Sequence, residues 1–382
     1  MIREARERIK NSVVRTPLVR LNVDDAPASI FLKLENLQPT SSFKVRGVCN
    51  ALALSGRALS KGVYTVSAGN MAQALAWQAK EIGIPCSVIV PDNAPASTFL
   101  KLENLQPTSS FKVRGVCNAL ALSGRALSKG VYTVSAGNMA QALAWRAKEI
   151  GIPCSVIVPD IAPATKLEGV KRYGARIVPL GFDEVWEVVK NYRYGPLESE
   201  GWNFIHPFAD ARMIAGNGTI GFELLEDLPN LDSIVVPFGG GGLSAGIAIA
   251  VKSQNPKVRV YACEPETAAP LAASYSKGSA QQIDRIPSFV DGIGGKSVVP
   301  EMWKLVRSLL EGSIVVSLRE TAAALRLILE RNRVLAEGAG AASVAAALTG
   351  KAGLGRVVCI VSGGNIDPEK LVTILHGGVP ST

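Results

Sequence analysis

The sequence has few of the residues that metal centres and disulfide scaffolds require. Its 382 residues include two histidines, His206 and His376, and neither lies in a recognisable motif. We interpret His206, in F-I-H-P-F, as structural. Six cysteines occur without a C-x-x-C spacing and within apolar stretches, which favours buried free thiols in a reducing compartment over disulfides or zinc. We therefore expect no metal site and a cytoplasmic location.

Long apolar runs and clustered charges are also missing. No apolar run approaches the roughly 18 residues that span a bilayer. Residues 1–18 are charged and amphipathic at helical spacing, unlike a secretory signal. The net charge of +9 comes from scattered basic residues, without the aromatic and basic interleaving typical of nucleic-acid binding. We expect a globular protein that binds neither membranes nor nucleic acids.

A near-identical internal repeat is the most unusual feature of the chain. Residues 26–93 match residues 94–161 at an offset of 68 positions, with three differences: Ile30 against Thr98, Gln78 against Arg146, and Asn93 against Ile161. Solenoid repeats diverge and recur several times, so we interpret this repeat as a recent or engineered tandem duplication. Removal of one copy would leave a chain of 314 residues.

Short apolar runs alternate with helical patterns along the sequence. Runs such as V-Y-T-V, S-I-V-V-P-F and R-V-V-C-I-V are apolar on both faces, which is typical of parallel strands covered by helices. We predict a two-lobed α/β fold with mostly parallel sheets and a duplicated βαβαβ unit. We expect a large lobe from residues 1–60 and 170–382, and a small lobe, with the surplus repeat material, from residues 61–169.

Three kinds of polar loop each follow a predicted strand and precede a helical pattern. S-A-G-N occurs at 67–70 and 135–138, G-G-G-G at 239–242, and S-G-G-N at 362–365. Ligands of open parallel sheets bind beyond the carboxyl ends of the strands, so we expect these loops to face one crevice. The four glycines offer backbone N–H groups and a helix N-terminus to an anion, and predict a phosphate site. A flexible turn is the alternative interpretation.

Each copy of the repeat also carries S-S-F-K-V-R-G, with Lys44 in the first copy and Lys112 in the second. Taken alone, such a lysine is usually an exposed helix residue. A lysine and a phosphate site in one crevice, however, indicate an aldehyde cofactor that carries a phosphate and forms a Schiff base with the amine. Pyridoxal 5′-phosphate meets this description.

In this order and at this spacing, the four motifs resemble the fold-type II pyridoxal-phosphate enzymes, and within them the serine/threonine dehydratase and serine racemase group. The resemblance covers the whole chain apart from one copy of the repeat. It implies roles for both copies: a catalytic lysine (Lys44 or Lys112), a neighbour of the cofactor ring (Phe43 or Phe111), and a partner of the ring oxygen (Asn70 or Asn138). It further implies a phosphate site (Gly239, Gly240, Gly241, Gly242 and Leu243), a neighbour of the pyridine nitrogen (Ser362), and a loop for the substrate carboxylate (Ser67, Ala68 and Gly69, or Ser135, Ala136 and Gly137).

The resemblance implies the β-elimination of water from L-threonine, L-serine or a bulkier β-hydroxy amino acid, as in amino-acid catabolism. The products would be a 2-oxo acid and ammonia. The lysine would remove the α-proton, and the cofactor phosphate would protonate the departing hydroxyl. The alternatives are a racemase or β-replacement synthase of the same fold, or a cofactor-binding shell inactivated by the duplication.

Three departures from the family pattern bear on this choice. Ala68 and Ala136 stand where racemases carry a serine as a second base, which argues against efficient racemisation. The residue six positions after Glu264 is a proline, not the acid of metal-binding members, so no divalent-ion site is expected. Met71 and Met139 stand where a histidine is common, which points to a reshaped side-chain pocket.

The copied lysines must share one glycine loop and one Ser362, so we expect only one lysine in the site. Lys44 with Asn70, Lys112 with Asn138, and Lys44 with Asn138 all remain open. The surplus copy carries apolar faces suited to burial. We therefore expect a homo-oligomer, a dimer, whose assembly is altered or domain-swapped by the repeat.

Overall fold

The computed structural model describes residues 1–20, 31–42, 44–55, 59, 62–64, 70–87, 98–160, 164–353 and 355–381. The chain divides into two compact units. Unit 1 contains residues 1–95 and 327–334, and unit 2 contains residues 96–326 and 335–382. The first copy of the repeat thus belongs to unit 1, and nearly all of the second copy belongs to unit 2. None of the helices formed by the described residues is long and apolar enough to cross a membrane.

Unit 1 is a small helical cluster with two short pairs of strands. Its elements are α1 (Ile2–Ile9), β1 (Leu18–Arg20), β2 (Phe31–Lys33), α2 (Lys44–Ser55), β3 (Val63–Tyr64), α3 (Asn70–Glu81) and β4 (Cys86–Ser87). β1 and β2 pair antiparallel, and β3 and β4 pair parallel. Val45, Val48 and Leu52 recur at helical spacing on α2, so one face of the helix packs with α1 and α3 into a common apolar core.

The larger sheet of unit 2 has five parallel strands in the order β12-β11-β10-β13-β5. The strands are β5 (Thr98–Leu102), β10 (Ser233–Pro237), β11 (Arg259–Pro265), β12 (Gly312–Val316) and β13 (Val357–Val361). The helices that accompany this sheet are α9 (Ala211–Asp227), α10 (Gly242–Gln254), α11 (Pro270–Lys277), α12 (Pro300–Val306), α13 (Leu318–Asn332), α14 (Gly338–Leu348) and α15 (Pro368–Leu375).

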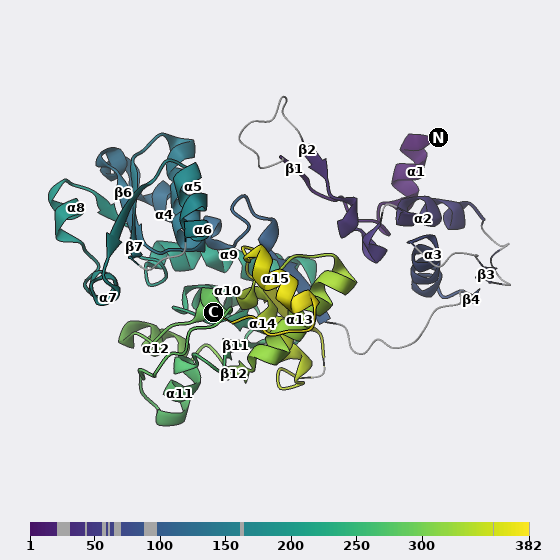
Figure 1. Ribbon diagram of the computed structural model, residues 1–382. Helices are drawn as coiled ribbons and strands as arrows, with labels where there is room; N and C mark the ends of the chain where they lie inside the picture. The colour runs from purple at the N-terminus through teal and green to yellow at the C-terminus, as the bar shows by residue number, and fades with distance from the viewer. Residues whose placement is uncertain are drawn as a thin grey trace. The chain divides into compact units, whose positions relative to one another are not determined.

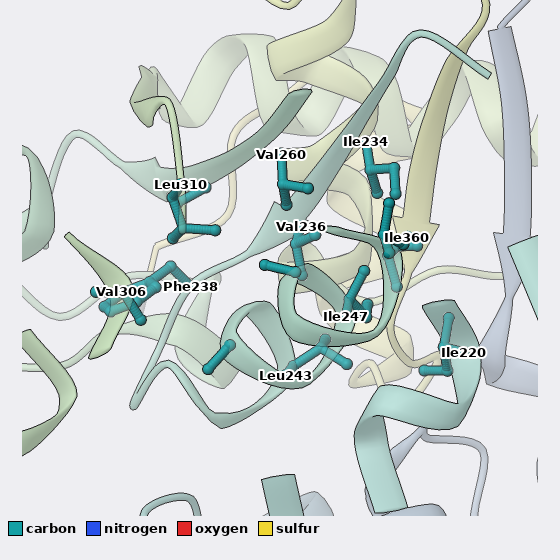
Figure 2. Packing of buried hydrophobic residues seen from close by; sticks show 14 of the residues in the cluster. Ile220, Ile234, Val236, Phe238, Leu243, Ile247, Val260, Val306, Leu310 and Ile360 are labelled. Carbon is teal, nitrogen blue, oxygen red and sulfur yellow. The ribbon is translucent and has the colours of Figure 1, made fainter. Parts of the chain in front are cut away.

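Every residue of β10 and β13 is buried, as expected for strands covered on both faces. Figure 2 shows Val236 of β10 and Ile360 of β13 close to Leu243 and Ile247 of α10, within the core cluster. α14 packs against β10 and β13, and the Ser343 hydroxyl donates a hydrogen bond to the carbonyl of Ile360. The sheet is therefore rigidly supported where its strands end.

The smaller sheet of unit 2 has four parallel strands in the order β8-β7-β6-β9. The strands are β6 (Val131–Val134), β7 (Cys154–Pro159), β8 (Arg176–Leu180) and β9 (Asn203–Phe204). The helices are α4 (Lys112–Ser123), α5 (Asn138–Ile150), α6 (Ala164–Arg172), α7 (Phe182–Asn191) and α8 (Gly195–Ser199). Figure 1 shows α5 beside β6 and β7, against which it packs.

The α/β class and the mostly parallel sheets are confirmed. The strands are distributed differently from the expected lobes. Residues 170–382 were expected in the large lobe, but β8 and β9 pair with β7 and β6. Short crossovers return a parallel strand to its neighbour, so β8 continues the sheet of β7 through α6. Residues 1–60 fall in unit 1, and the first strand of the larger sheet along the chain is β5 of the second copy.

The same twelve residues form α2 and α4, yet the two helices have different surroundings. A Cβ atom on Gly115 of α4 would lie 2.8 Å from Asn217 Oδ1 and 2.9 Å from the Met213 carbonyl, so α4 and α9 approach closely. At the equivalent Gly47 of α2, no heavy atom of the described residues lies within 4 Å of that position. Among the described residues, the space beside Gly47 of α2 is therefore unfilled where α9 packs beside Gly115 of α4.

Candidate active site

A cavity of about 450 Å³ opens in unit 2 where strands of both sheets end. Its lining includes the loop Ser135–Asn138 after β6, the loop Gly239–Gly242 after β10, and Ser362 and Asn365 after β13. Phe111 and Lys112, at the start of α4, complete this group. The polar loops that were expected to share a crevice thus lie around one cavity. The S-A-G-N loop that lines it is Ser135–Asn138 of the second copy.

Lys112 places a partly buried amine in this cavity. Its Nζ donates a hydrogen bond to the carbonyl of Pro207 over 2.8 Å and lies 5.2 Å from the ring centroid of Phe111. Loss of hydration lowers the pKa of Lys112 to about 8, against an opposing effect of the Glu337 carboxylate. The backbone before Lys112 is fixed, because the Phe111 amide donates to the carbonyl of Ser362 over 3.0 Å.

Asn138 belongs to a partly buried polar network that ties three segments together. Its amide nitrogen donates to both carboxylate oxygens of Glu337, over 2.9 and 3.1 Å. Its side-chain oxygen accepts from the amide of Asn365 over 2.8 Å, and the same Asn365 nitrogen donates to the Thr108 carbonyl. The orientation of the Asn138 side chain is therefore set by partners on both sides.

Glu337 and Asn365 were missed by the sequence analysis. Glu337 is 8% exposed and stands at the N-cap of α14. A lone carboxylate between apolar and glycine residues, in V-L-A-E-G-A-G-A-A-S, is unusual enough to have been a signal. Asn365 ends the S-G-G-N motif, in which only Ser362 was given a role.

The loop after β10 leaves backbone groups free of side chains. Gly241 has a φ of +87° and is the N-cap of α10, with no side-chain cap. A Cβ atom on Gly240 would lie 2.1 Å from Cγ of Phe208, and one on Gly242 would lie 2.4 Å from the Phe208 carbonyl oxygen. Only glycine fits at these positions. The uncapped start of α10 then lines the cavity, and such a helix N-terminus is suited to an anion.

His206 supports this arrangement and is neutral. It is 3% exposed, and its Nδ1 accepts hydrogen bonds from the amides of Phe208 and Ala209. Burial lowers the pKa of His206 to about 4. The imidazole thus holds the turn that places Phe208 against the glycine loop.

The rest of the cavity wall separates into an apolar and a charged part. Val185, Trp186 and Val189 of α7 line it together with Met139 and Pro159. The segment between α11 and α12 contributes the charged side chains Arg285, Asp291 and Lys296. A ligand in this cavity would therefore meet both kinds of surface.

The described residues that line this cavity all belong to unit 2, which holds nearly all of the second copy of the repeat. Lys44 begins α2 in unit 1 and is exposed. Phe43, Ser67, Ala68 and Gly69 lie outside the described residues, as does the side chain of Asn70, whose backbone begins α3. The described residues contain no group of three or more side chains that could together bind a metal ion.

Residues 9–99 and 96–363 each match the sequence model of the family described as "Pyridoxal-phosphate dependent enzyme". The family model therefore matches the chain twice. The first match begins at residue 9, ahead of both copies of the repeat, and the second begins at residue 96, within the second copy.

Similar proteins are named L-threonine ammonia-lyase or L-threonine dehydratase. The L-threonine ammonia-lyase of Thermotoga maritima is 39% identical over 297 residues, which cover 77% of this chain and 73% of that protein. The Escherichia coli K12 protein named "L-threonine dehydratase catabolic TdcB" is 37% identical over 309 residues, which cover 79% of this chain and 93% of that protein.

Solved structures are similar as well. Threonine deaminase isoform 2 from Solanum lycopersicum has a TM-score of 0.67 and 31% identity, over 73% of this chain and 82% of that one. Maize serine racemase has a TM-score of 0.66 and 30% identity, over 98% of this chain and 95% of that one. The chain belongs to the pyridoxal-phosphate-dependent enzymes.

Proposed function

We propose that this protein eliminates water from a β-hydroxy amino acid and releases a 2-oxo acid and ammonia. The substrate is L-threonine, L-serine or an analogue with a larger side chain. The observation that carries the proposal is the position of Lys112, whose amine shares one cavity with a glycine loop suited to phosphate and with the loop Ser135–Asn138. Relatives at 37–40% identity are named L-threonine ammonia-lyase or dehydratase.

Pyridoxal 5′-phosphate fits the residues present. The uncapped N-terminus of α10 matches its phosphate, and the half-buried Lys112 matches its aldehyde. When bound, the cofactor would draw electrons from the substrate Cα and so acidify its proton. We assign Gly239–Leu243 to the phosphate, Phe111 to the ring face, Asn138 to the ring oxygen and Ser362 to the pyridine nitrogen.

Lys112 acts as the general base of the proposed reaction. Its Nζ takes the proton from the substrate Cα. A pKa of about 8 leaves a far larger neutral fraction of amine near neutral pH than an ordinary lysine has. The carbonyl of Pro207 holds one N–H of the amine and thereby limits its rotation.

The loop before α5 is proposed to bind the substrate carboxylate. The Gly137 amide donates to the hydroxyl of Ser135 over 3.1 Å, which folds the loop back on itself. Gly137 is the N-cap of α5 and provides no side-chain cap, so the first amides of the helix are available to an anion. Ser135, Ala136 and Gly137 would thus anchor one end of the substrate.

The apolar wall supports the larger substrates. Trp186, Val185 and Val189 form a surface that a methyl or hydrogen β-substituent would cover poorly. Methylene-scale differences in an apolar pocket change kcat/KM roughly 10- to 200-fold. We expect kcat/KM to rise from serine to threonine to 3-phenylserine, measured as ammonia release. The reverse order would show that this wall lies outside the substrate site.

Racemisation is disfavoured by Ala136. A racemase needs a second acid–base group on the far face of the substrate, and the alanine at this position of the cavity lining cannot exchange a proton. Chiral analysis of unreacted serine distinguishes the two reactions. Accumulation of the D-enantiomer at the rate of ammonia release would replace the proposed function with the alternative.

Paired lysine variants test the assignment, because the repeat supplies its own control. Lys112→Ala should abolish ammonia release and the visible absorbance of lysine-bound cofactor, whereas Lys44→Ala, in an identical heptapeptide, should leave both unchanged. Loss in Lys44→Ala alone would assign the site to the first copy. Retention of both signals in the double variant would overturn the mechanism.

We further propose that the repeat arose by tandem duplication and that its first copy is surplus to the active site. α4 packs on α9 around Gly115. At the equivalent Gly47 of α2, no heavy atom of the described residues lies within 4 Å, which favours an exchange in which α2 of one chain packs on α9 of another. The resulting cytoplasmic enzyme would be a dimer with swapped repeat units.

A further inference from the structure

Arg285 has a hydrogen-bonding capacity that the described residues leave unused. It lies between α11 and α12 and lines the cavity described above. Among the described residues, no group pairs with its buried Nε, and no ion pair joins its guanidinium to a carboxylate. Buried donors are nearly always paired in folded proteins, so the unpaired Nε of this cavity-lining residue points to its guanidinium as a ligand contact.

The guanidinium is placed by the turn that covers the glycine loop. A Cβ atom on Gly294 would lie 3.1 Å from Nε and 3.5 Å from Nη2 of Arg285, so the arginine packs closely on this glycine. One residue earlier, Ile293 Cα would lie 3.4 Å from a Cβ on Gly239. Arg285 therefore packs on Gly294, whose neighbour Ile293 lies close to Gly239 of the loop assigned to the phosphate.

The carboxylates of the cavity already have partners. Asp291 forms an ion pair with Lys370 over 3.7 Å, and Glu337 accepts two hydrogen bonds from Asn138. The positive charge of Arg285 has no such counterpart among the residues described. A guanidinium presents parallel N–H donors that match two oxygens of a carboxylate or phosphate.

We propose that Arg285 binds an anionic oxygen group of a ligand in this cavity, either the phosphate of the cofactor or an acidic group on the substrate side chain. The inference rests on the proposed cofactor site and extends it by a residue outside the glycine loop. The cofactor phosphate and a substrate acid would both present an anionic oxygen group to the guanidinium. Two ratios of binding affinities distinguish these two ligands.

The first ratio compares pyridoxal 5′-phosphate with pyridoxal, which lacks the phosphate. Both are titrated into the full-length protein freed of cofactor, followed by visible absorbance. If Arg285 contacts the phosphate, Arg285→Gln should weaken binding of the phosphorylated compound about tenfold or more and leave pyridoxal unchanged. Arg307→Gln, an exposed change of equal charge on the far end of α12, is the control.

The second ratio compares L-aspartate with L-asparagine, which have the same shape and differ in charge. Their binding to the cofactor-loaded protein is measured from absorbance changes. If Arg285 contacts a substrate acid, the wild type should prefer aspartate, and Arg285→Gln should lose that preference while keeping its affinity for the cofactor.

If both affinity ratios measured for Arg285→Gln equal those of Arg307→Gln, the proposal is overturned. Should Arg285→Gln fail to fold, as seen by circular dichroism, Arg285→Lys provides the same two ratios, because it keeps the charge and loses the paired donors. Neither titration depends on turnover, so a failure of the proposed reaction would be recognised separately by ammonia release.

Discussion

Glu337 places a negative charge within electrostatic range of Lys112, the amine that the proposed reaction uses. Its carboxylate is held by the amide of Asn138 and raises the pKa of Lys112, which desolvation alone would depress further. The acid therefore tunes the base from a distance while it fixes the residue assigned to the cofactor ring.

Glu337→Gln should consequently lower the pKa of Lys112 below its value of about 8, because the favourable interaction with the charged amine is lost while the shape is kept. The rate of Lys112 acetylation in cofactor-free protein, followed by mass spectrometry against pH, measures this directly. The exposed Glu226→Gln on α9 is the control. An unchanged or raised midpoint in Glu337→Gln would contradict the electrostatic coupling.

Gly240 lies under the ring of Phe208 and leaves no room for a side chain. Gly240→Ala should displace the ring or the loop, at a cost of about 1–3 kcal/mol in the free energy of unfolding and with weaker cofactor binding. Gly195→Ala, where no heavy atom lies within 4 Å of the new Cβ, should change stability by less than about 0.5 kcal/mol. Equal effects of the two substitutions in urea unfolding would refute this account.

At the scale of the elements, an ion-pair network anchors the start of α4. The equivalent helix of the first copy, α2, has only part of this network. Arg114 donates to both oxygens of Glu103, over 2.7 and 2.9 Å, and also to Glu223 of α9. Arg46 makes the corresponding pair with Glu35, over 2.7 and 2.8 Å. Glu103 is 1% exposed, whereas the Glu35 side chain is 23% exposed.

Arg114→Met should therefore destabilise the protein by about 3 kcal/mol or more, because it strands a buried carboxylate. Arg46→Met should cost about 1 kcal/mol or less, since Glu35 can be hydrated. Urea unfolding of both variants gives the comparison within one chain. Similar losses would show that the burial of Glu103 does not set the strength of the pair.

Glu264 introduces a pH dependence at the end of β11. Its carboxylate is fully buried and accepts hydrogen bonds from the amides of Leu271 and Ala272 and from the hydroxyl of Ser313. Burial nevertheless raises its pKa from 4.5 to about 7. The folded state then binds a proton that the unfolded state releases, so stability falls as pH rises from about 4.5 through 7.

Glu264→Gln should remove this pH dependence, which amounts to a loss on the order of 2–3 kcal/mol between pH 5 and pH 8 in the wild type. The urea midpoints of both proteins at these two pH values measure it. A wild type that is more stable at pH 8 than at pH 5, with a difference unaffected by Glu264→Gln, would exclude the effect.

The elements show which parts of the site were predictable. The loops Ser135–Asn138, Gly239–Gly242 and Ser362–Asn365 could be grouped from sequence because each follows a parallel strand, and ligands bind beyond the carboxyl ends of such strands. Arg285 could not be found this way, since it stands in an irregular segment between two helices. Glu337 precedes a helix that follows no strand directly, so its proximity to Asn138 depends on packing alone.

The division into sheets was likewise beyond the sequence pattern. β8 and β10 are both short apolar runs, and nothing in their composition tells which sheet each joins. The identity of the seated lysine was undecidable for a simpler reason, because Lys44 and Lys112 have identical neighbours along the chain. Only three-dimensional context separates them.

For the molecule as a whole, the chain without residues 26–93 is the decisive comparison. This 314-residue protein retains every described residue of the cavity. Its kcat/KM should stay within about tenfold of the full-length value, a difference of at most about 1.4 kcal/mol. Its mass distribution by light scattering should differ, because α2, which is proposed to pack on α9 of another chain, is gone. Identical distributions would show that the first copy takes no part in assembly.

The identity of α2 and α4 also makes folding a competition for a single partner, α9. Ser55 and Ser123 end the two helices, 156 and 88 positions before Ala211 begins α9. Chain-closure entropy favours the nearer copy by only about twofold, or about 0.5 kcal/mol. On chain closure alone, the first copy would be seated in a substantial minority of molecules, so the complete loss of activity expected for Lys112→Ala requires a stronger selection. That selection can come from the three differing positions, from the different flanking segments, such as α1 packed on α2, or from the order in which the copies leave the ribosome.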